Sequence, residues 1–189
     1  MRTAFVFLAL LAFLAGFWAY SIYTASDTQI ETSDHLDIAY EVDGARIRLQ
    51  DGHAETEAAP GSATKVVTRY FGNELRTDLD GDGREDIAFI LTQEGGGSGT
   101  FYYAVAALNT PEGFVGSDGY FLGDRIAPQS TDVSPNPRHQ RVVVFNYADR
   151  APGEPMSAQP SVGKSAYLKL DPDSMRWAVV EPDFEGEAR

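Results

Sequence analysis

An acidic loop is the part of this chain whose residue types and spacing are best suited to a chemical task. Residues 78–86 read DLDGDGRED, and the apolar run 87–91 follows directly. Aspartates occupy positions one, three, five and nine, and Gly83 at position six can adopt the positive φ that turns the chain back on itself. Alternate residues of such a loop point inward, and Ca²⁺ takes six to eight oxygen ligands. The spacing predicts a calcium site built from the carboxylates of Asp78, Asp80, Asp82 and Asp86 and the backbone carbonyl of Arg84.

The loop resembles the DxDxDGxxD calcium loops of FG-GAP and VCBS-type extracellular repeats. Its first half also matches an EF-hand loop, but an EF-hand requires a bidentate Glu at position twelve, where Phe89 stands, and a helix afterwards. The motif occurs once, whereas a β-propeller of such repeats would show it several times. The resemblance implies a structural Ca²⁺ ion. An acidic Asp-Gly turn without a metal is the alternative.

The N-terminus carries the signal for export. Residues 4–23 contain no charge, and twenty helical residues span about 30 Å, the thickness of a bilayer core. We expect an N-terminal transmembrane anchor or signal peptide over 1–25, a tether over 26–34 and an extracytoplasmic β domain over 35–189. Aromatic residues at the outer end favour an uncleaved single-pass anchor in the cell membrane. Ala19-Tyr20-Ser21 offers a cleavage site, so secretion after signal cleavage is the alternative.

Charge and cysteine content narrow the classes of partner. All 28 acidic residues and 14 of the 15 basic ones follow residue 23, which leaves the exported part with a net charge of −14. This balance argues against nucleic acid as a partner, and it leaves a protein or a glycan as the open alternatives. The chain has no cysteine, so neither a disulfide framework nor a lipid-attached cysteine is possible.

Short strand patterns separated by turn residues run through the exported part. Asp43-Gly44 and Asp51-Gly52 are hairpin dipeptides, and the glycine-rich stretch 95–99 is expected to join the strand after the acidic loop to its antiparallel partner. No convincing helical period over ten residues follows residue 23. The pattern predicts an all-β fold, either an antiparallel sandwich or an open barrel or meander. The expected strands are 36–42, 45–50, 53–57, 64–71, 86–93, 100–108, 114–115, 119–122, 127–133, 140–147, 166–170 and 177–180.

The other motifs in the sequence give weaker evidence for a function than the acidic loop gives for calcium binding. Ser161 and Lys164 match an S-x-x-K pattern, but no S-D-N or K-T-G follows. The three histidines show no metal-ligand spacing. Aromatic residues at 101–103 and 120–121 could stack on sugar rings, although strand aromatics more often pack in a core. The proline-containing segments 133–138 and 149–163 are expected to be surface loops.

The wider sequence resembles a set of uncharacterised bacterial envelope proteins in which a short hydrophobic N-terminus precedes the core. The residues that carry this likeness are Tyr70-Phe71-Gly72-Asn73-Glu74, the acidic loop, Thr100-Phe101-Tyr102-Tyr103 and Gly123-Asp124-Arg125-Ile126-Ala127-Pro128. The resemblance implies an envelope location and no particular activity. We therefore expect a non-enzymatic binding or structural module with one structural calcium loop. A small hydrolase, or a regulator of hydrolases, that acts on envelope glycan or peptide is the alternative.

Overall fold

A computed structural model describes residues 34–181. The expected N-terminal span over 1–25 and nearly all of the expected tether lie outside the described residues, as do residues 182–189. Within 34–181, no helix has both the length and the apolar character needed to cross a bilayer.

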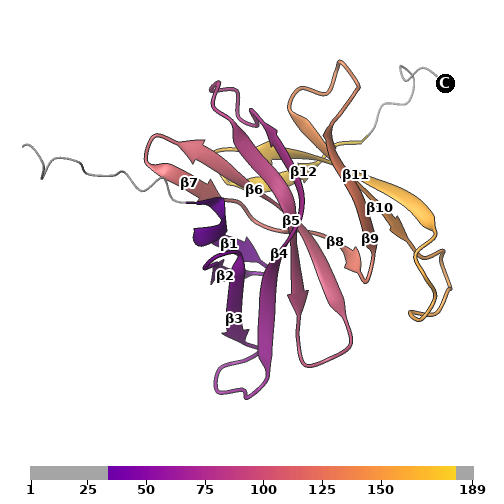
Figure 1. The fold of residues 1–189 in the computed structure, drawn as a ribbon. Coiled ribbons are helices and arrows are strands. Elements are labelled where there is room, and N and C mark those ends of the chain that lie inside the picture. Colours follow the sequence, from indigo (N-terminus) through magenta and orange to yellow (C-terminus); the bar gives the residue numbers. More distant parts are fainter. Residues whose placement is uncertain (1–33, 182–189) are drawn as a thin grey trace, which may run out of the picture. The chain divides into compact units, whose positions relative to one another are not determined.

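The described part of the chain is built from strands, with one 3-10 helix at its start (Figure 1). All named strand pairs are antiparallel. The prediction of an all-β fold is confirmed. In chain order the elements are η1 (His35–Asp37), β1 (Ala39–Val42), β2 (Ala45–Arg48), β3 (His53–Glu57), β4 (Lys65–Thr77), β5 (Asp86–Glu94), β6 (Thr100–Thr110), β7 (Gly113–Gly116), β8 (Tyr120–Asp124), β9 (Ala127–Val133), β10 (Val142–Asp149), β11 (Val162–Asp171) and β12 (Arg176–Val179).

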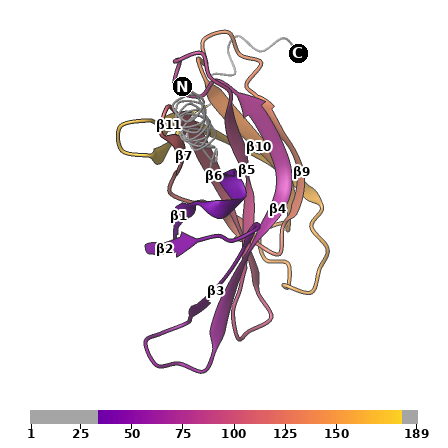
Figure 2. The same cartoon turned by 60° about the vertical axis from the view of Figure 1, so that its left-hand side comes forward.

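The strands form three sheets, which Figures 1 and 2 show from two sides. The largest has the order β3-β4-β5-β6-β7, and β8 also pairs with β6 beyond the end of β7. A four-stranded sheet has the order β12-β11-β10-β9, and β1 and β2 form a separate hairpin. The neighbours in all three sheets come mostly from consecutive strands, so the turns between them largely determine the topology.

The six-stranded sheet is covered on both faces, and this explains the continuous apolar run at 87–91. Ala88 and Ile90 of β5 face a core shared with Val143, Phe145 and Leu168 of the four-stranded sheet. The alternate β5 residues face a second core, which also contains Tyr40, Val42 and Ile47 of the hairpin; these β5 residues are Ile87, Phe89 and Leu91. Side chains on a strand alternate between faces, so a strand with two buried faces has no polar alternation.

The hairpin dipeptides behave as their residue types predict. Asp43 and Gly44 both have positive φ, 52° and 74°, as do Asp51 and Gly52, 51° and 72°. Two consecutive residues with positive φ make the turn whose twist matches a two-residue hairpin. The first of these turns places β1 opposite β2, with Tyr40 paired to Ile47.

Among the strand boundaries that differ from the expectation, three have a clear local reason. Residues 36 and 37, expected in the strand 36–42, belong to a 3-10 helix over His35–Asp37, because the Asp34 carboxylate accepts a hydrogen bond from Leu36 N and caps the turn. Strand β4 continues to Thr77, past Gly72 and Asn73, because shifts of register there absorb residues with positive φ. Strand β11 begins at Val162, four residues before the expected start, since it pairs with the whole length of β10.

Candidate functional site

The acidic loop connects β4 to β5 and lies at the start of the central strand of the largest sheet. It brings together the carboxylates of Asp78, Asp80 and Asp86, each of which offers an oxygen within 4.8 Å of the others. Leu79 lies between the first two and is buried in the core between the sheets, with 1% of its surface exposed. The alternation of inward carboxylates and a buried leucine holds the loop against the body of the domain.

Asp86 is the most enclosed member of this group, with 0% of its surface exposed. Its Oδ2 accepts a hydrogen bond from Leu79 N at 2.8 Å, and its Oδ1 accepts one from Asn109 N at 2.8 Å. Burial raises the pKa of Asp86, the two backbone hydrogen bonds oppose that change, and the charges of Asp80 and Asp82 add to it. A cation beside Asp86 would offset the cost of burying its negative charge and would reduce the repulsion from Asp80 and Asp82.

Asp78 is held by the backbone of its own loop. Its Oδ1 accepts a hydrogen bond from Gly81 N at 2.6 Å, and its Oδ2 accepts one from Gly83 N at 3.0 Å. The bond from Gly81 is the largest cause of a lowered pKa of Asp78, and Arg141 contributes through its charge. Gly81 and Gly83 have φ of 95° and 86°, the conformation that favours glycine. The loop therefore presents an ionised Asp78.

The Asp82 side chain interacts with Arg84 and is not one of the three carboxylates that converge. Asp82 Oδ1 accepts a hydrogen bond from Arg84 N at 2.7 Å, and its Oδ2 pairs with the Arg84 guanidinium. Arg84 Nε also donates to the carbonyl oxygen of Asn109 on β6. Of the five ligands expected from the sequence, the structure brings three side chains together and directs the Asp82 side chain to Arg84.

A second arginine reaches the loop from a distant segment and was not anticipated from the sequence. A methyl group at Gly81 would lie 2.7 Å from Nη1 of Arg141, which precedes β10. The loop thus has a cationic neighbour of its own beside Asp78. No local pattern identifies this contact, because Arg141 is sixty residues away in sequence and is brought to the loop by the packing of the two large sheets.

The aromatic residues of β6 and β8 divide between core and surface. Tyr103 is buried with the hairpin core, and Tyr102 packs on the opposite face. Phe101 and Phe121, however, are 37% and 51% exposed. Their ring centroids lie 6.3 Å apart, and the Phe121 ring lies 5.5 Å from that of Tyr103. The expectation of core packing therefore describes the tyrosines at 102 and 103 and not these two phenylalanines.

The two phenylalanines line a pocket of about 430 Å³ on the hairpin-side face of the six-stranded sheet. Tyr103 also lines this pocket, and Asp43 of the β1–β2 turn adds a carboxylate. Burial raises the pKa of Tyr103, and the nearby charge of Asp43 adds to the rise. The remaining lining residues are Val66, Gln93 and Gly95.

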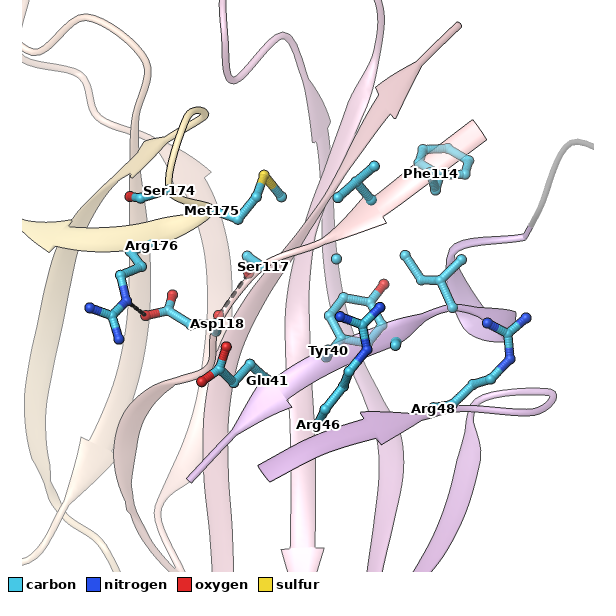
Figure 3. Close-up of a pocket in the computed structure, with 14 residues that line it drawn as sticks. Tyr40, Glu41, Arg46, Arg48, Phe114, Ser117, Asp118, Ser174, Met175 and Arg176 are labelled. Atoms are coloured by element: carbon cyan, nitrogen blue, oxygen red, sulfur yellow. Dashed lines mark hydrogen bonds and ion pairs between the residues drawn. The ribbon is translucent and has the colours of Figure 1, made fainter. Parts of the chain in front are cut away.

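Another pocket, of about 480 Å³, lies among the β1–β2 hairpin, β7 and the β11–β12 turn (Figure 3). Arg46 and Arg48 are two residues apart on β2, and Arg176 stands on the other side of the pocket. Arg176 Nε lies 4.0 Å from Asp118 Oδ2, and Asp118 Oδ1 accepts a hydrogen bond from Trp177 N at 3.0 Å. With Glu41 also in the lining, the pocket mixes both signs of charge and specifies no single class of ligand.

The histidines do not converge. His35 is 8% exposed and lies between Asp34 and Glu74, whereas His53 begins β3.

His139 Nδ1 lies 2.8 Å from Ser134 Oγ in the loop before β10, a contact that the sequence did not reveal. Ser134 is only 7% exposed, and its Oγ also accepts a hydrogen bond from Asn136 N at 3.4 Å. This arrangement braces a proline-containing turn, and it offers a substrate little access to the hydroxyl.

Comparison of the chain with protein-family models, with curated proteins and with solved structures finds no match.

Proposed function

We propose that this protein is an exported β-sandwich module that binds a partner at the cell envelope and is stabilised by one Ca²⁺ ion at the acidic loop. The three convergent carboxylates Asp78, Asp80 and Asp86 carry the proposal. Carboxylate oxygens are preferred ligands of this hard cation, and its flexible shell accepts water or a backbone carbonyl at the remaining positions. The role of the ion is structural, because it ties the loop to the first residue of the central strand.

The proposed location rests on the N-terminal sequence. An apolar anchor over residues 4–23 would hold the protein to the cell membrane as a single-pass protein, with the acidic β domain outside the cytoplasm. Millimolar Ca²⁺ in an extracellular compartment suits a site of weak affinity, with a Kd on the order of 10⁻⁴ M. The proposed location would therefore supply the calcium concentration that the proposed site needs.

A calcium titration followed by thermal unfolding tests the metal site. At about 1 mM Ca²⁺, a Kd near 10⁻⁴ M adds roughly 1.4 kcal/mol to the free energy of unfolding. For a domain of this size, the melting temperature should rise by about 3–6 °C. Mg²⁺ should produce a smaller rise, because it demands a tight octahedron and gives up water reluctantly.

Two variants of the loop and one control locate the site. Asp80→Asn should abolish the calcium-dependent rise, because it removes one of the three convergent charges. Arg141→Gln should raise the calcium affinity by about two- to tenfold, since it removes a positive charge beside Asp78. Asp173→Asn, on the exposed β11–β12 turn, should behave as the wild type. A full calcium response in Asp80→Asn would place any calcium site elsewhere.

Asp86 is unsuitable for this test, although it is part of the group. Its two oxygens accept hydrogen bonds from two backbone N–H groups, and an asparagine side chain would retain only one acceptor oxygen. Asp86→Asn would therefore lower stability with or without calcium.

A further inference from the structure

We propose that the pocket lined by Phe101, Tyr103 and Phe121 binds an uncharged pyranose sugar of a glycan chain. This inference names a ligand class for the binding role put forward under the proposed function, and rests on that role. The pocket is separate from the acidic loop, since the two share no residue. Sugar binding and calcium binding can therefore fail independently.

The rings are placed by regular strand pairing. Phe101 and Tyr103 are alternate residues of β6 and share one face of the sheet. Tyr103 pairs with Phe121 of β8, and Phe101 pairs with Gln93 of β5. Side chains fixed in this way lose little conformational entropy when a ligand binds, so the aromatic surface is preorganised.

The exposure of the two phenylalanines is the observation that points to a ligand. The β1–β2 hairpin covers much of this face of the sheet, but Phe101 and Phe121 remain 37% and 51% exposed. The C–H groups on one face of a pyranose are apolar, and they can lie against an aromatic ring while the hydroxyls project sideways. The Phe121 ring is tilted by 48° to the Phe101 ring and by 55° to the Tyr103 ring, so one face of a sugar would lie against a single ring while the others border it. The pocket volume of about 430 Å³ is in the range of small-molecule sites.

Polar groups at the edge of the pocket distinguish a sugar from an apolar peptide. Asp43 adds a carboxylate from the hairpin turn, and Gln93 adds an amide that is 7% exposed. Gln93 Nε2 donates to Thr68 Oγ1 at 3.2 Å, which holds the amide in place. An apolar partner would leave the Asp43 carboxylate desolvated and unpaired, whereas sugar hydroxyls can donate to it.

Charge selects among sugars. The part of the chain after residue 23 carries a net charge of −14, and the only ionisable groups in the pocket lining are Asp43 and the Tyr103 hydroxyl. An acidic glycan would be repelled both by the domain and by Asp43, so the site favours neutral sugars.

Titration of the full chain, purified in detergent, with two soluble probes tests the inference. The probes are β-1,4-linked hexasaccharides of glucose and of N-acetylglucosamine, measured by calorimetry at about 1 mM calcium and after chelation. At least one probe should bind with a Kd on the order of 0.1–1 mM, as expected for a few stacking contacts. Phe121→Ala should weaken that binding about tenfold or more, and Asp43→Asn should weaken it several-fold.

Phe71→Ala is the matched control. Phe71 is also exposed, at 43%, and its ring also packs against a tyrosine, Tyr102, at 5.3 Å. It lines neither pocket described above, so its truncation should leave sugar binding unchanged. Phe121→Ala should unfold at nearly the wild-type temperature, which would show that lost binding is not lost folding.

Three results would overturn the proposal. The first is no binding of either probe up to about 10 mM, which corresponds to less than about 3 kcal/mol of affinity. The second is equal binding by the wild type and Phe121→Ala. The third is equal loss in Phe121→Ala and Phe71→Ala. Asp80→Asn separates the two proposals, because it should bind the sugar while it loses the calcium response.

Discussion

The aspartates of this domain show how the surroundings of a residue set its chemistry. Asp86 is enclosed at the start of β5, and burial raises its pKa. Asp149 at the end of β10 has the opposite shift, because Lys164 Nζ donates to its Oδ2 at 2.7 Å and lowers the pKa of Asp149. The two residues are chemically identical, and their positions in the sheets decide which of them favours protonation.

The Asp149–Lys164 pair predicts a specific dependence of stability on pH. The folded-state pKa of Asp149 is depressed, so the stabilisation is present above its unfolded value, near 3.9, and is lost as the pH falls through the folded value. Asp149→Asn should lower the free energy of unfolding at pH 7 by less than about 1 kcal/mol, because Lys164 is 46% exposed. Urea denaturation from pH 7 to 2 should show a shallower loss of stability for the variant than for the wild type. Asp173→Asn is the control, and an unchanged slope in Asp149→Asn would contradict the prediction.

The β1–β2 hairpin is the element that gives the largest sheet its second covered face. Segments 117–119 and β1 are joined by backbone hydrogen bonds, Glu41 N to Ser117 O at 3.1 Å and Gly119 N to Glu41 O at 2.7 Å. Tyr40 contributes a ring 5.6 Å from that of Phe89, and its hydroxyl donates to the carbonyl oxygen of His35 at 2.7 Å. The hairpin is thus held through both its backbone and its side chains.

Gly116 of β7 allows this close approach, because it has no side chain. A methyl group added at this position should therefore destabilise the packing of the hairpin. An added Cβ would lie 2.3 Å from the carbonyl oxygen of Ala39 and 2.8 Å from the Tyr40 ring. Gly116→Ala should therefore push the hairpin away and lower the free energy of unfolding by about 1–3 kcal/mol. Gly163→Ala in β11 is the control, because its Cβ would meet nothing within 4 Å. Chemical denaturation measures both variants, and equal stability of the two would show that the hairpin tolerates displacement.

At the scale of the whole molecule, an apolar N-terminal run and a strongly acidic remainder suggest two environments for one chain. The run over residues 4–23 is uncharged, whereas the rest carries a net charge of −14. The described part is all-β and places most of its polar side chains at the surface. This division is the basis of the proposal that the chain has a membrane anchor and an extracytoplasmic domain.

The proposed location has a direct test in cells that produce the full chain. We expect the mature protein to retain its N-terminal segment and to fractionate with membranes, while a protease added outside the cytoplasmic membrane digests the β domain. Mass spectrometry of the purified protein measures the first property. A mature N-terminus near Ile22 would replace the anchor with a cleaved signal, and complete protection of the β domain would contradict export.

The amino-acid sequence by itself determined the features that depend on neighbours along the chain. Two-residue turns at Asp43-Gly44 and Asp51-Gly52, the strand after the acidic loop and its glycine-linked partner β6 all follow from local conformational preference and from apolar pattern. The spacing of aspartates in residues 78–86 likewise identified a candidate metal loop, because its ligands are contiguous.

Only the tertiary structure decided which side chains meet and which remain exposed. It directed Asp82 toward Arg84, brought Arg141 beside Asp78, and left Phe101 and Phe121 partly exposed beside the turn of the hairpin. Each outcome depends on how one sheet packs on another and on where a covering element ends. A linear pattern shows that a strand residue is apolar, but burial is a property of the opposite surface, which is contributed by residues far away in the sequence.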